Sequence, residues 1–561
     1  MKKHSEVPTP ETRRFAGPVI GVLCWFLPFL FCLNGSSAEF YTNWAAAHFS
    51  DILSQSGPSF DPDNDGQTNL IEFAFGTDPR VPSNLSSAFT PSFSNPAGGL
   101  GIVLFEAAGH RPGVQVDLLL STNMSQWTHG WFQRTVTNSL PGDPTNSVRE
   151  LLTTVMPPAN QWFVRSIVAL FDAGGTAANY YVATNGSDSN SGTSSNAPFL
   201  TLNKAASVAN PGNLIYMRGG RFNYAAKASL SRSGSPTAPI RVRSFPGEHP
   251  ILDFTNAPFG VRGIEITGNY WQLYGLEIAN ARDNGIYITG KSNIVELCVA
   301  HDCADTGIHI HTGGAYNLIL NCDSYRNFDP TNSPQGGNAD GFGCKFSPGP
   351  GNVFSGCRSW ENSDDGWDLW EANTTVIISN CWTFRNGFNY FGATNFGGNG
   401  NGFKLGGNYV FGPHRICHSI SFGNASHGYD QNNNTAGQIV DNNIGWANGK
   451  RNINLNHTTN STPHIVRNNI SFAGAQSDAF YLGTLLTNNS WQIISPSVGT
   501  NDFLSLDVSF AMAPRRDDGG LPDVPFLRPV PTGRLIDRGT ETGDPFQGSG
   551  LDLGALESPA W

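Results

Sequence analysis

Two short stretches of the chain bring acidic side chains close together. "NSDDGWDLWE" (362–371) has two adjacent aspartates and a third three residues later, and "NADGFGCK" (338–345) has a similar form. Together they supply Asp340, Asp364, Asp365 and Asp368. Neighbouring carboxylates repel one another unless a cation lies between them, and their oxygens suit Ca²⁺. If the fold brings the two stretches together, they predict a calcium site.

A lysine in a third stretch, Lys404 of "NGNGFKLGG" (399–407), could act at such a site. Ca²⁺ bound to a substrate carboxylate stabilises the charge that develops when the adjacent carbon loses a proton, and a neutral lysine can take that proton as general base. In a uronic acid polymer this loss at C5, with a leaving group at C4, gives β-elimination. The cation lowers the pKa of Lys404 and Asp368 raises it, and we expect an alkaline optimum. The alternative is a structural surface pair of Lys404 with Asp368.

The elements that would position these residues recur along the chain from Tyr180. Where glycines mark the repeat, its spacing is 22 to 26 residues. One series contains "CDSYRN" (322–327), "CRSWEN" (357–362), "CWTFRN" (381–386), "ISFGN" (420–424) and "IGWAN" (444–448). A second contains "NGIYI" (284–288), "TGIHI" (306–310), "DGFGC" (340–344), "DGWDL" (365–369), "NGFKL" (401–405) and "HGYDQ" (427–431). Short strands at this period predict an all-β solenoid, a parallel β-helix in which each coil pairs with the next.

Strand alternation assigns the side chains of the second series to two faces. The residues one and three positions after each glycine are apolar and should face the core, so the residue between them points outward. This outward column contains Tyr287, His309, Gly343, Asp368, Lys404, Asp430, Asn454 and Tyr481. The column before the glycine contains Asn284, Thr306, Asp340, Asp365, Asn401 and His427. The four carboxylates and Lys404 should therefore meet at one outer corner, on coils about 4.8 Å apart; solvated surface acids are the alternative.

Repeated asparagines and cysteines predict two internal ladders. Asn327, Asn362, Asn386, Asn424 and Asn448 share one corner position, where their amides should stack. Cys322, Cys357 and Cys381 share an interior position. An odd number of cysteines in the exported chain favours buried thiols over a disulfide framework.

Two coils are longer than the others. The spacing is 34 residues from Gly307 to Gly341 and 36 from Gly366 to Gly402, and the extra residues flank the acidic stretches. Such loops on one face of a solenoid often wall a binding site. Four residues there are candidates for substrate binding: Lys345, Trp370, Tyr390 and Asp430. The two aromatic rings could stack on sugars, or could simply pack.

Residues 1–38 have the form of a signal peptide. Lys2, Lys3, Arg13 and Arg14 precede the apolar run 18–33, and the small residues "SSA" (36–38) follow it. The run is short for a membrane span and contains Pro28. We therefore expect no membrane span in the mature chain, and a secreted, periplasmic or cell-surface protein.

Residues 39–84 contain a calcium-loop pattern. In "FDPDNDGQTNLIEFAFGTDP" (60–79), oxygen-bearing side chains occupy the ligand positions of an EF-hand loop, with Gly66 at the sharp turn. The predicted ligands are Asp61, Asp63, Asp65, Gln67, Asn69 and Glu72. We expect a structural calcium site; an acidic surface turn is the alternative.

Between this loop and the repeats, residues 85–171 alternate apolar and polar positions, which predicts a small β-sandwich-like antiparallel module. Residues 172–179 predict a linker to the β-helix domain at 180–561. The net charge of −11, without a basic stripe, argues against a nucleic-acid partner. We expect a monomer.

"NADGFGCK", "SWENSDDGWDLWE" and "NGNGFKLGG" resemble the calcium-site and catalytic-lysine segments of polysaccharide lyase family 9. The resemblance extends from about Tyr180 to residue 557 and implies a right-handed parallel β-helix that cleaves pectate with a Ca²⁺ cofactor. It also implies that Asp340, Asp364, Asp365 and Asp368 are the calcium ligands and Lys404 the base. The family includes enzymes that act on rhamnogalacturonan. The resemblance therefore does not decide whether the acidic plant-type polymer is homogalacturonan or rhamnogalacturonan.

Two further alternatives share this fold. "NAD", "DD" and "SHG" (426–428) echo motifs of β-helical polygalacturonases, which are hydrolases. That chemistry does not need Lys404, and the basic triplet expected after His427 is missing. The other alternative is a non-catalytic carbohydrate-binding or adhesion β-helix, which would bind polymer with calcium yet form no product.

Overall fold

The computed structural model describes residues 180–557, apart from 237, 460–461, 517–518, 545 and 547, and the backbone of seven strands between residues 92 and 170. The predicted signal peptide (1–38), calcium loop and linker (172–179) lie outside the described residues. So do all six predicted loop ligands: Asp61, Asp63, Asp65, Gln67, Asn69 and Glu72. The chain divides into two compact units, one of which holds everything described from residue 180 onward.

The N-terminal strands form two sheets, with strand orders β1-β2-β6-β5 and β4-β3-β7, in which the pairs β1–β2, β2–β6, β3–β4 and β3–β7 are antiparallel. The strands are β1 (Ser92–Ser94), β2 (Gly101–His110), β3 (Val114–Ser121), β4 (Thr128–His129), β5 (Gln133–Asn138), β6 (Val148–Met156) and β7 (Phe163–Leu170). They fall within residues 85–171, where the sequence predicts a small β module. The boundaries and role of that module stay predictions.

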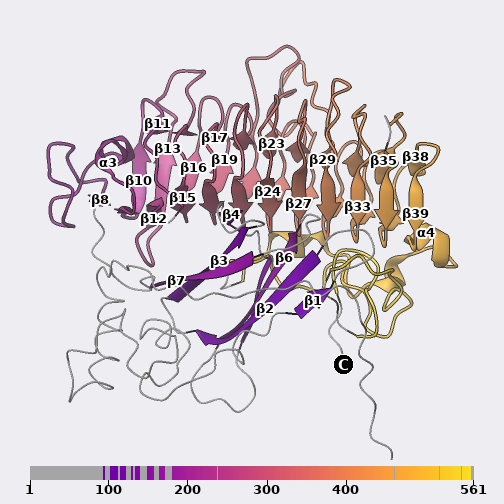
Figure 1. Ribbon diagram of the computed structural model, residues 1–561. Helices are drawn as coiled ribbons and strands as arrows, with labels where there is room; N and C mark the ends of the chain where they lie inside the picture. The colour runs from indigo at the N-terminus through magenta and orange to yellow at the C-terminus, as the bar shows by residue number, and fades with distance from the viewer. Residues whose placement is uncertain are drawn as a thin grey trace, which may run out of the picture. The chain divides into compact units, whose positions relative to one another are not determined.

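The second unit is a parallel β-helix of three long sheets (Figure 1). The β10–β37 sheet comprises β10 (Gly220–Asn223), β13 (Pro250–Asp253), β16 (Glu277–Ala279), β19 (Val299–His301), β22 (Asp323–Tyr325), β25 (Arg358–Trp360), β28 (Trp382–Phe384), β31 (Ile420–Phe422), β34 (Ile444–Trp446) and β37 (Ile470–Phe472). The β11–β38 sheet comprises β11 (Ala228–Leu230), β14 (Ile264–Ile266), β17 (Ile286–Ile288), β20 (Ile308–Ile310), β23 (Phe342–Cys344), β26 (Trp367–Asp368), β29 (Phe403–Lys404), β32 (Tyr429–Asp430), β35 (Ile453–Leu455) and β38 (Ala479–Phe480).

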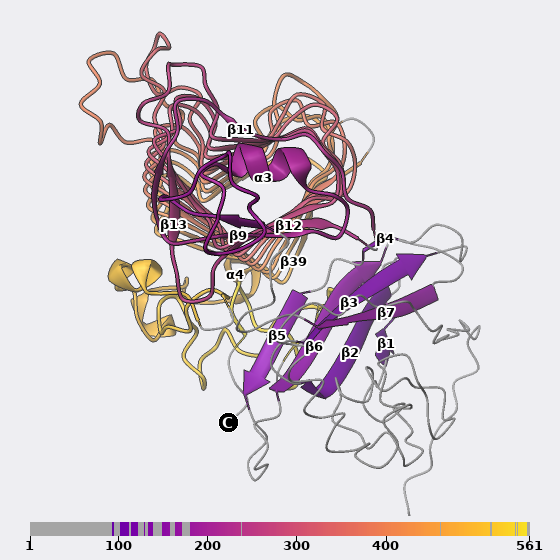
Figure 2. The ribbon, with the colours of Figure 1, turned by 90° about the vertical axis from the view of Figure 1, so that its left-hand side faces the viewer.

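The β8–β39 sheet closes each coil on the third side. It comprises β8 (Tyr180–Val182), β9 (Leu214–Met217), β12 (Ile240–Ser244), β15 (Trp271–Tyr274), β18 (Ile294–Glu296), β21 (Leu318–Leu320), β24 (Asn352–Ser355), β27 (Val376–Ser379), β30 (Arg415–Cys417), β33 (Ile439–Asp441), β36 (Ile465–Arg467) and β39 (Leu485–Thr487). The view along the coils in Figure 2 shows helix α3 (Leu202–Val208) lying across one end of the interior. The helix is capped by the Thr201 side chain and buries Leu202, Ala205 and Ala206, so it shields the apolar core from water at that end.

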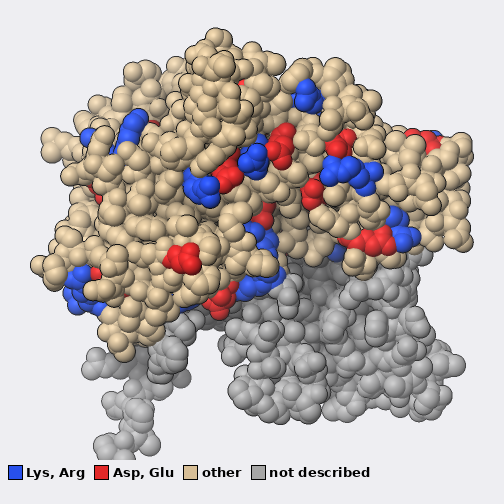
Figure 3. Space-filling model, turned by 180° about the vertical axis from the view of Figure 1, so that it is seen from behind, with Lys and Arg blue, Asp and Glu red and all other residues tan. Residues whose placement is uncertain are grey.

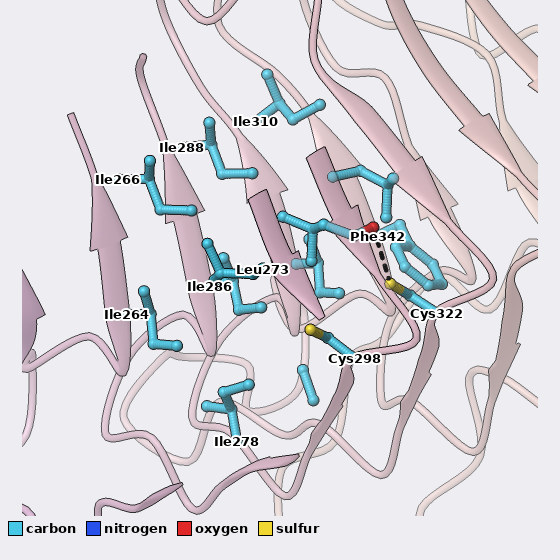
Figure 4. Close-up of a cluster of buried hydrophobic side chains, with 14 of the residues drawn as sticks. Ile264, Ile266, Leu273, Ile278, Ile286, Ile288, Cys298, Ile310, Cys322 and Phe342 are labelled. Atoms are coloured by element: carbon cyan, nitrogen blue, oxygen red, sulfur yellow. Dashed lines mark hydrogen bonds between the residues drawn. The ribbon is translucent and has the colours of Figure 1, made fainter. Parts of the chain in front are cut away.

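The interior is built from stacked aliphatic and thiol side chains (Figure 4). Pairs such as Ile286 and Ile288 are fully buried and lie beside the equivalent pair of the next coil. The predicted cysteine ladder is confirmed: Cys322, Cys357 and Cys381 are buried and free. Removal of this apolar surface from water stabilises the solenoid by about 25 cal/mol per Å² buried.

The predicted asparagine ladder is also present. Each buried Asn donates its side-chain amide to the carbonyl oxygen of the next: Asn327, Asn362, Asn386, Asn424 and Asn448 are joined in this way at 2.8–3.0 Å. The preceding residues Arg326, Glu361 and Arg385 have positive φ angles of 54°, 55° and 57°. A left-handed conformation costs free energy for a residue with a side chain, and the ladder bonds offset that cost at the corner.

The remaining chain after β39 contains α4 (Ser490–Ile493) and the 3₁₀-helices η3 (Thr500–Asp502) and η4 (Val508–Met512). Phe526 of this segment contacts the outer aromatic rings of the β10–β37 sheet, at ring-centroid distances of 4.9 Å from Phe422 and 5.9 Å from Trp446. Arg515 pairs with Asp323 and donates to the Gly356 carbonyl. The segment therefore covers an apolar outer face of the solenoid.

One predicted register is wrong. The sequence pattern aligns Tyr481 with Asn454 in the outward column, but Asn454 pairs with Ala479. The last coil has no glycine at its corner, so the alternation of its side chains fits more than one register.

Candidate active site on the β11–β38 sheet

The predicted outward column forms on four neighbouring strands of the β11–β38 sheet. Gly343 of β23 pairs with Asp368 of β26, Asp368 with Lys404 of β29, and Lys404 with Asp430 of β32. These short strands are positioned by the apolar residues that flank each outward residue, such as Trp367 and Leu369, which are buried in the core. The coil period therefore places Asp368 and Lys404 side by side.

Asp340 and Asp365 occupy successive coils at the corner that precedes these strands. The Asp340 Oδ1 atom accepts the backbone N–H of Asp365 at 3.1 Å, and Asp365 Oδ1 accepts the backbone N–H of Asn401 at 2.7 Å. The Asn401 side-chain amide donates to the same oxygen at 2.9 Å. One oxygen of each carboxylate thus fixes the next coil, and the second oxygen is available to other partners.

Three of the four predicted calcium ligands offer oxygens to one point. Single oxygens of Asp340, Asp365 and Asp368, all buried, lie within 4.8 Å of one another. Asp364 is buried beside them but is not part of this group, and its Oδ1 atom accepts the backbone N–H of Asn399 at 2.5 Å. A set of carboxylate oxygens fits a hard cation such as Ca²⁺.

Lys404 lies between two of these carboxylates. Its Nζ atom is 3.1 Å from Asp365 Oδ2 and 3.2 Å from Asp368 Oδ2, and 5.2 Å from the centre of the Trp370 ring. The side chain is only 6% exposed. The predicted neighbourhood of Lys404 and the acidic cluster is therefore present, with Trp370 at its side.

Lys345, predicted to bind substrate, lies within the acidic cluster. Its side chain is buried, and its Nζ atom donates to Asp340 Oδ2 at 2.6 Å and lies 3.6 Å from Asp368 Oδ2. Strand alternation puts it on the outward side, two residues after Gly343, where a side chain of that length folds back over the glycine. Lys345 is therefore a member of the acidic cluster.

Burial and mutual repulsion shift the charges of the cluster. Burial raises the pKa of Asp340 to about 7, against the ammonium of Lys345, which lowers it. Burial and neighbouring acids also raise the pKa values of Asp364 and Asp365. Burial lowers the pKa of Lys404, but the surrounding carboxylates outweigh it and raise that pKa well above its ordinary value. A cluster of this kind favours additional positive charge.

The two insertions meet beside the cluster. The backbone N–H of Gln335 donates to Asn395 and that of Gly397 donates to Gln335, and the rings of Phe328 and Phe391 stack at 4.6 Å. The second insertion ends at Asn399, which donates to Asp364. The two insertions therefore contact each other and reach the acidic cluster, while their predicted role as walls of a binding site stays a prediction.

The remaining substrate-binding candidates are separate from the three-oxygen group. Tyr390 is 39% exposed and its hydroxyl accepts a hydrogen bond from Arg385, which pairs with Glu361. Asp430 follows Lys404 along the sheet and accepts the Asn454 amide at 2.8 Å. Tyr390 therefore contacts Arg385 rather than the cluster, whereas Asp430 is one coil from Lys404.

Sequence reasoning missed two residues at this corner. The Thr306 hydroxyl donates to Asp340 Oδ2 at 3.0 Å, from the same column as the acids. His309 is buried in the outward column, and neither of its ring nitrogens has a hydrogen-bond partner among the described residues. Both positions stand in the predicted columns, so the columns themselves could have identified them.

No helix in the described part of the chain is long and apolar enough to cross a lipid bilayer.

Comparisons with known proteins place the chain among enzymes of one kind. The sequence model of the Pel9A-like right-handed β-helix region matches residues 180–471. Pectate lyase L of Dickeya chrysanthemi is 41% identical over 67% of this chain and 90% of its own length, and Pectate lyase L of Paenibacillus polymyxa is 35% identical over 66% and 85%. The crystal structure of pectate lyase Pel9A has 41% identity and a TM-score of 0.64 over 67% of this chain and 96% of that one. A rhamnogalacturonan lyase structure has 29% identity and a TM-score of 0.57 over 63% and 96%.

Proposed function

The chain belongs to polysaccharide lyase family 9, whose members have the Pel9A-like right-handed β-helix, and from this premise we propose that it cleaves pectate by calcium-dependent β-elimination with Lys404 as general base. The family makes the protein a polysaccharide lyase. The observation that carries the proposed mechanism is the position of Lys404 Nζ, buried between Asp365 and Asp368 on the outer face of the sheet.

Asp340, Asp364, Asp365 and Asp368 are the residues proposed to hold calcium. The fit rests on the chemistry of the donor set, because the converging atoms are all carboxylate oxygens, and on its charge, which is negative even with two lysines present. When bound there, Ca²⁺ supplies positive charge that stabilises the anion formed at the substrate carboxylate and favours the neutral form of Lys404.

The chain's own groups then have distinct tasks. Lys404 accepts the proton from C5 of the uronic acid, and the bond from C4 to the leaving oxygen breaks to give an unsaturated product. Trp370, beside the Lys404 ammonium, is proposed to line the substrate groove, as is Asp430 on the next coil. Because the carboxylates favour the charged form of Lys404, the rate should rise toward alkaline pH.

Homogalacturonan in its de-esterified form is the proposed substrate, since relatives at 41% and 35% identity are named pectate lyases. The rhamnogalacturonan lyase likeness makes that polymer the second candidate. We also propose that the chain is exported, as the signal pattern at 1–38 predicts, and that it acts as a monomer.

The test is ultraviolet absorbance of the unsaturated product, measured with polygalacturonate and with rhamnogalacturonan, in calcium and in chelator. We expect a calcium-dependent rise with polygalacturonate that falls about 10²- to 10⁴-fold in Lys404→Ala, the range for loss of a general base. Lys291→Ala, at an exposed lysine away from the cluster, serves as the control and should retain activity. New reducing ends without ultraviolet absorbance would identify a hydrolase and contradict the proposal.

A further inference from the structure

Lys345 is buried in the acidic cluster, although the catalytic proposal gives it no task. The cluster holds four carboxylates and two ammonium groups, those of Lys345 and Lys404, and all six side chains are buried. Their formal charges leave a net charge of −2, which one divalent cation balances. We propose that Lys345 is a built-in counter-ion that lowers the affinity of the cluster for the cation and raises the affinity of the loaded site for the anionic substrate. This inference rests on the proposed function, because it presupposes a cation in the cluster.

The contacts of Lys345 are with the oxygens that a cation would use. Its Nζ atom is 2.6 Å from Asp340 Oδ2 and 3.6 Å from Asp368 Oδ2, and both residues belong to the group whose oxygens converge within 4.8 Å. An ammonium group at this distance repels a divalent ion strongly even at a protein dielectric of about 20. Lys345 therefore opposes cation binding at the same oxygens.

The Lys345 side chain occupies space that a side chain at position 343 would otherwise fill. A Cβ atom at Gly343 would lie 3.3 Å from Lys345 Cε, and 3.1 Å from Cδ2 of the buried His309. The outward position of β23 thus lacks a side chain because the lysine stem and the His309 ring take its space. An apolar side chain could fill that space without the desolvation of an ammonium group, so packing alone does not account for a lysine here.

The second effect concerns the substrate. With Lys345, the loaded cluster has no net charge while Lys404 is protonated and a charge of −1 once Lys404 is neutral. Without Lys345 the loaded cluster is one unit more negative in either state and repels the uronate more strongly. The same substitution should therefore strengthen cation binding and weaken substrate binding, which a purely structural role does not predict.

Thr306 provides a matched control, because its hydroxyl donates to the same Asp340 Oδ2 atom at 3.0 Å but carries no charge. Thr306→Val removes a hydrogen bond to that oxygen and keeps the charge of the cluster. Lys345→Gln removes the charge and keeps a donor group, and Lys345→Met removes both. The four full-length proteins, wild type and the three variants, separate charge from orientation.

The experiment is a calorimetric titration with calcium chloride, followed by kinetics on polygalacturonate at saturating calcium. We expect calcium to bind Lys345→Gln and Lys345→Met about tenfold or more tightly than wild type, while KM rises by a similar factor. Thr306→Val should change both by less than about threefold. The calcium loop predicted within residues 60–79 contributes equally in all four proteins.

Several results would contradict the inference. Unchanged or weaker calcium binding in both Lys345 variants would show that the lysine only holds Asp340, and an equal gain in Thr306→Val would show that orientation rather than charge is responsible. A KM that does not rise would contradict the predicted effect of Lys345 on substrate binding.

Failure of the proposed function is distinguishable, because wild type itself would then show no lyase activity. If the variants melt early, calcium should raise their Tm more than that of wild type, and an equal or smaller rise would likewise contradict the inference.

Discussion

Lys404 and Lys345 share a side chain and an acidic neighbourhood but differ in position. Lys404 lies beyond Asp368 along the sheet, next to the Trp370 ring, while Lys345 lies on the other side, against Asp340 and near His309. Asp368 Oδ2 is within 4 Å of both ammonium groups. Asp368 therefore couples the proposed base, Lys404, to the proposed counter-ion, Lys345. A change of charge at one lysine should change the electrostatic environment of the other.

A residue outside the cluster gives a prediction about pH and stability. His301, on the β10–β37 sheet, contacts Asp302 Oδ2 at 2.7 Å and Glu277 Oε1 at 3.2 Å. Burial lowers its pKa, but the two carboxylates outweigh burial and raise it to about 9. The group is charged in the folded chain at a pH where an unfolded histidine, with a pKa near 6.5, is neutral. Its stabilising contribution is therefore complete below about pH 6.5 and is lost as the pH rises through about 9.

The measurement is the free energy of unfolding of wild type and His301→Gln across this pH range. We expect wild type to be more stable by about 1–3 kcal/mol at pH 6 and the difference to shrink by pH 10. Subtracting the variant removes the titration of other groups. A difference that stays constant with pH would show that the imidazole contributes only by packing.

At the scale of the elements, the asparagine ladder contributes to the stability of the solenoid at its corners. Asn386 lies in the middle, accepting the Asn362 amide at 2.9 Å and donating to Asn424 at 2.9 Å. Asn386→Ala removes the acceptor of the buried Asn362 backbone N–H, and it removes one hydrogen bond each from the Asn362 amide and the Asn424 side-chain oxygen. A buried group left without a partner costs about 1–3 kcal/mol, and each further hydrogen bond lost adds about 1 kcal/mol. We expect a loss of about 2–4 kcal/mol in chemical denaturation. Asn196→Ala, at an exposed loop position, should change stability by less than about 0.5 kcal/mol.

The solenoid could be predicted because one period governs both of its recurring series. Glycines and asparagines at the corners fix the coil length, and alternation then gives each side chain a face, which is why Asp368 and Lys404 were expected to be neighbours. The N-terminal modules have no repeat, so nothing comparable constrains them. Positions within the repeat follow from its local pattern, and the structure confirms the outward column as far as Asn454 but not Tyr481 of the last coil.

The place of Lys345 could not be predicted in this way. Alternation gives its face but not the bend of a long side chain over Gly343, which depends on the space that His309 and Thr306 leave. The contact between the two insertions, at Gln335 and Asn395, likewise depends on loops without a period. Sequence patterns do not determine tertiary contacts of this kind, so this part of the site could not be predicted.

At the scale of the whole molecule, several charges of the described surface are paired with charges of the opposite sign. Figure 3 shows the face opposite to that of Figure 1, where acidic and basic side chains lie as neighbouring groups in an otherwise uncharged surface. One row of such pairs joins Asp302, Arg326, Glu361 and Arg385. Exposed pairs contribute little stability, but on the face shown in Figure 3 they leave no broad field of one sign. The proposed anionic substrate would then be recognised locally, by the cluster together with its proposed cation.

The N-terminal loop leads to a prediction about calcium in the complete chain. Its six predicted ligands follow the EF-hand spacing, and the proposed cluster lies almost 300 residues later, between Asp340 and Lys404. Two independent sites should therefore bind two calcium ions per chain. In Asp61→Ala with Asp65→Ala, we expect one ion to be lost and activity at saturating calcium to be unchanged, because every proposed catalytic contact is made among residues 306–454. Asp365→Asn should lose the other ion together with activity. Equilibrium dialysis beside the lyase assay checks both, and loss of activity in the loop variant would instead make the N-terminal calcium part of the catalytic unit.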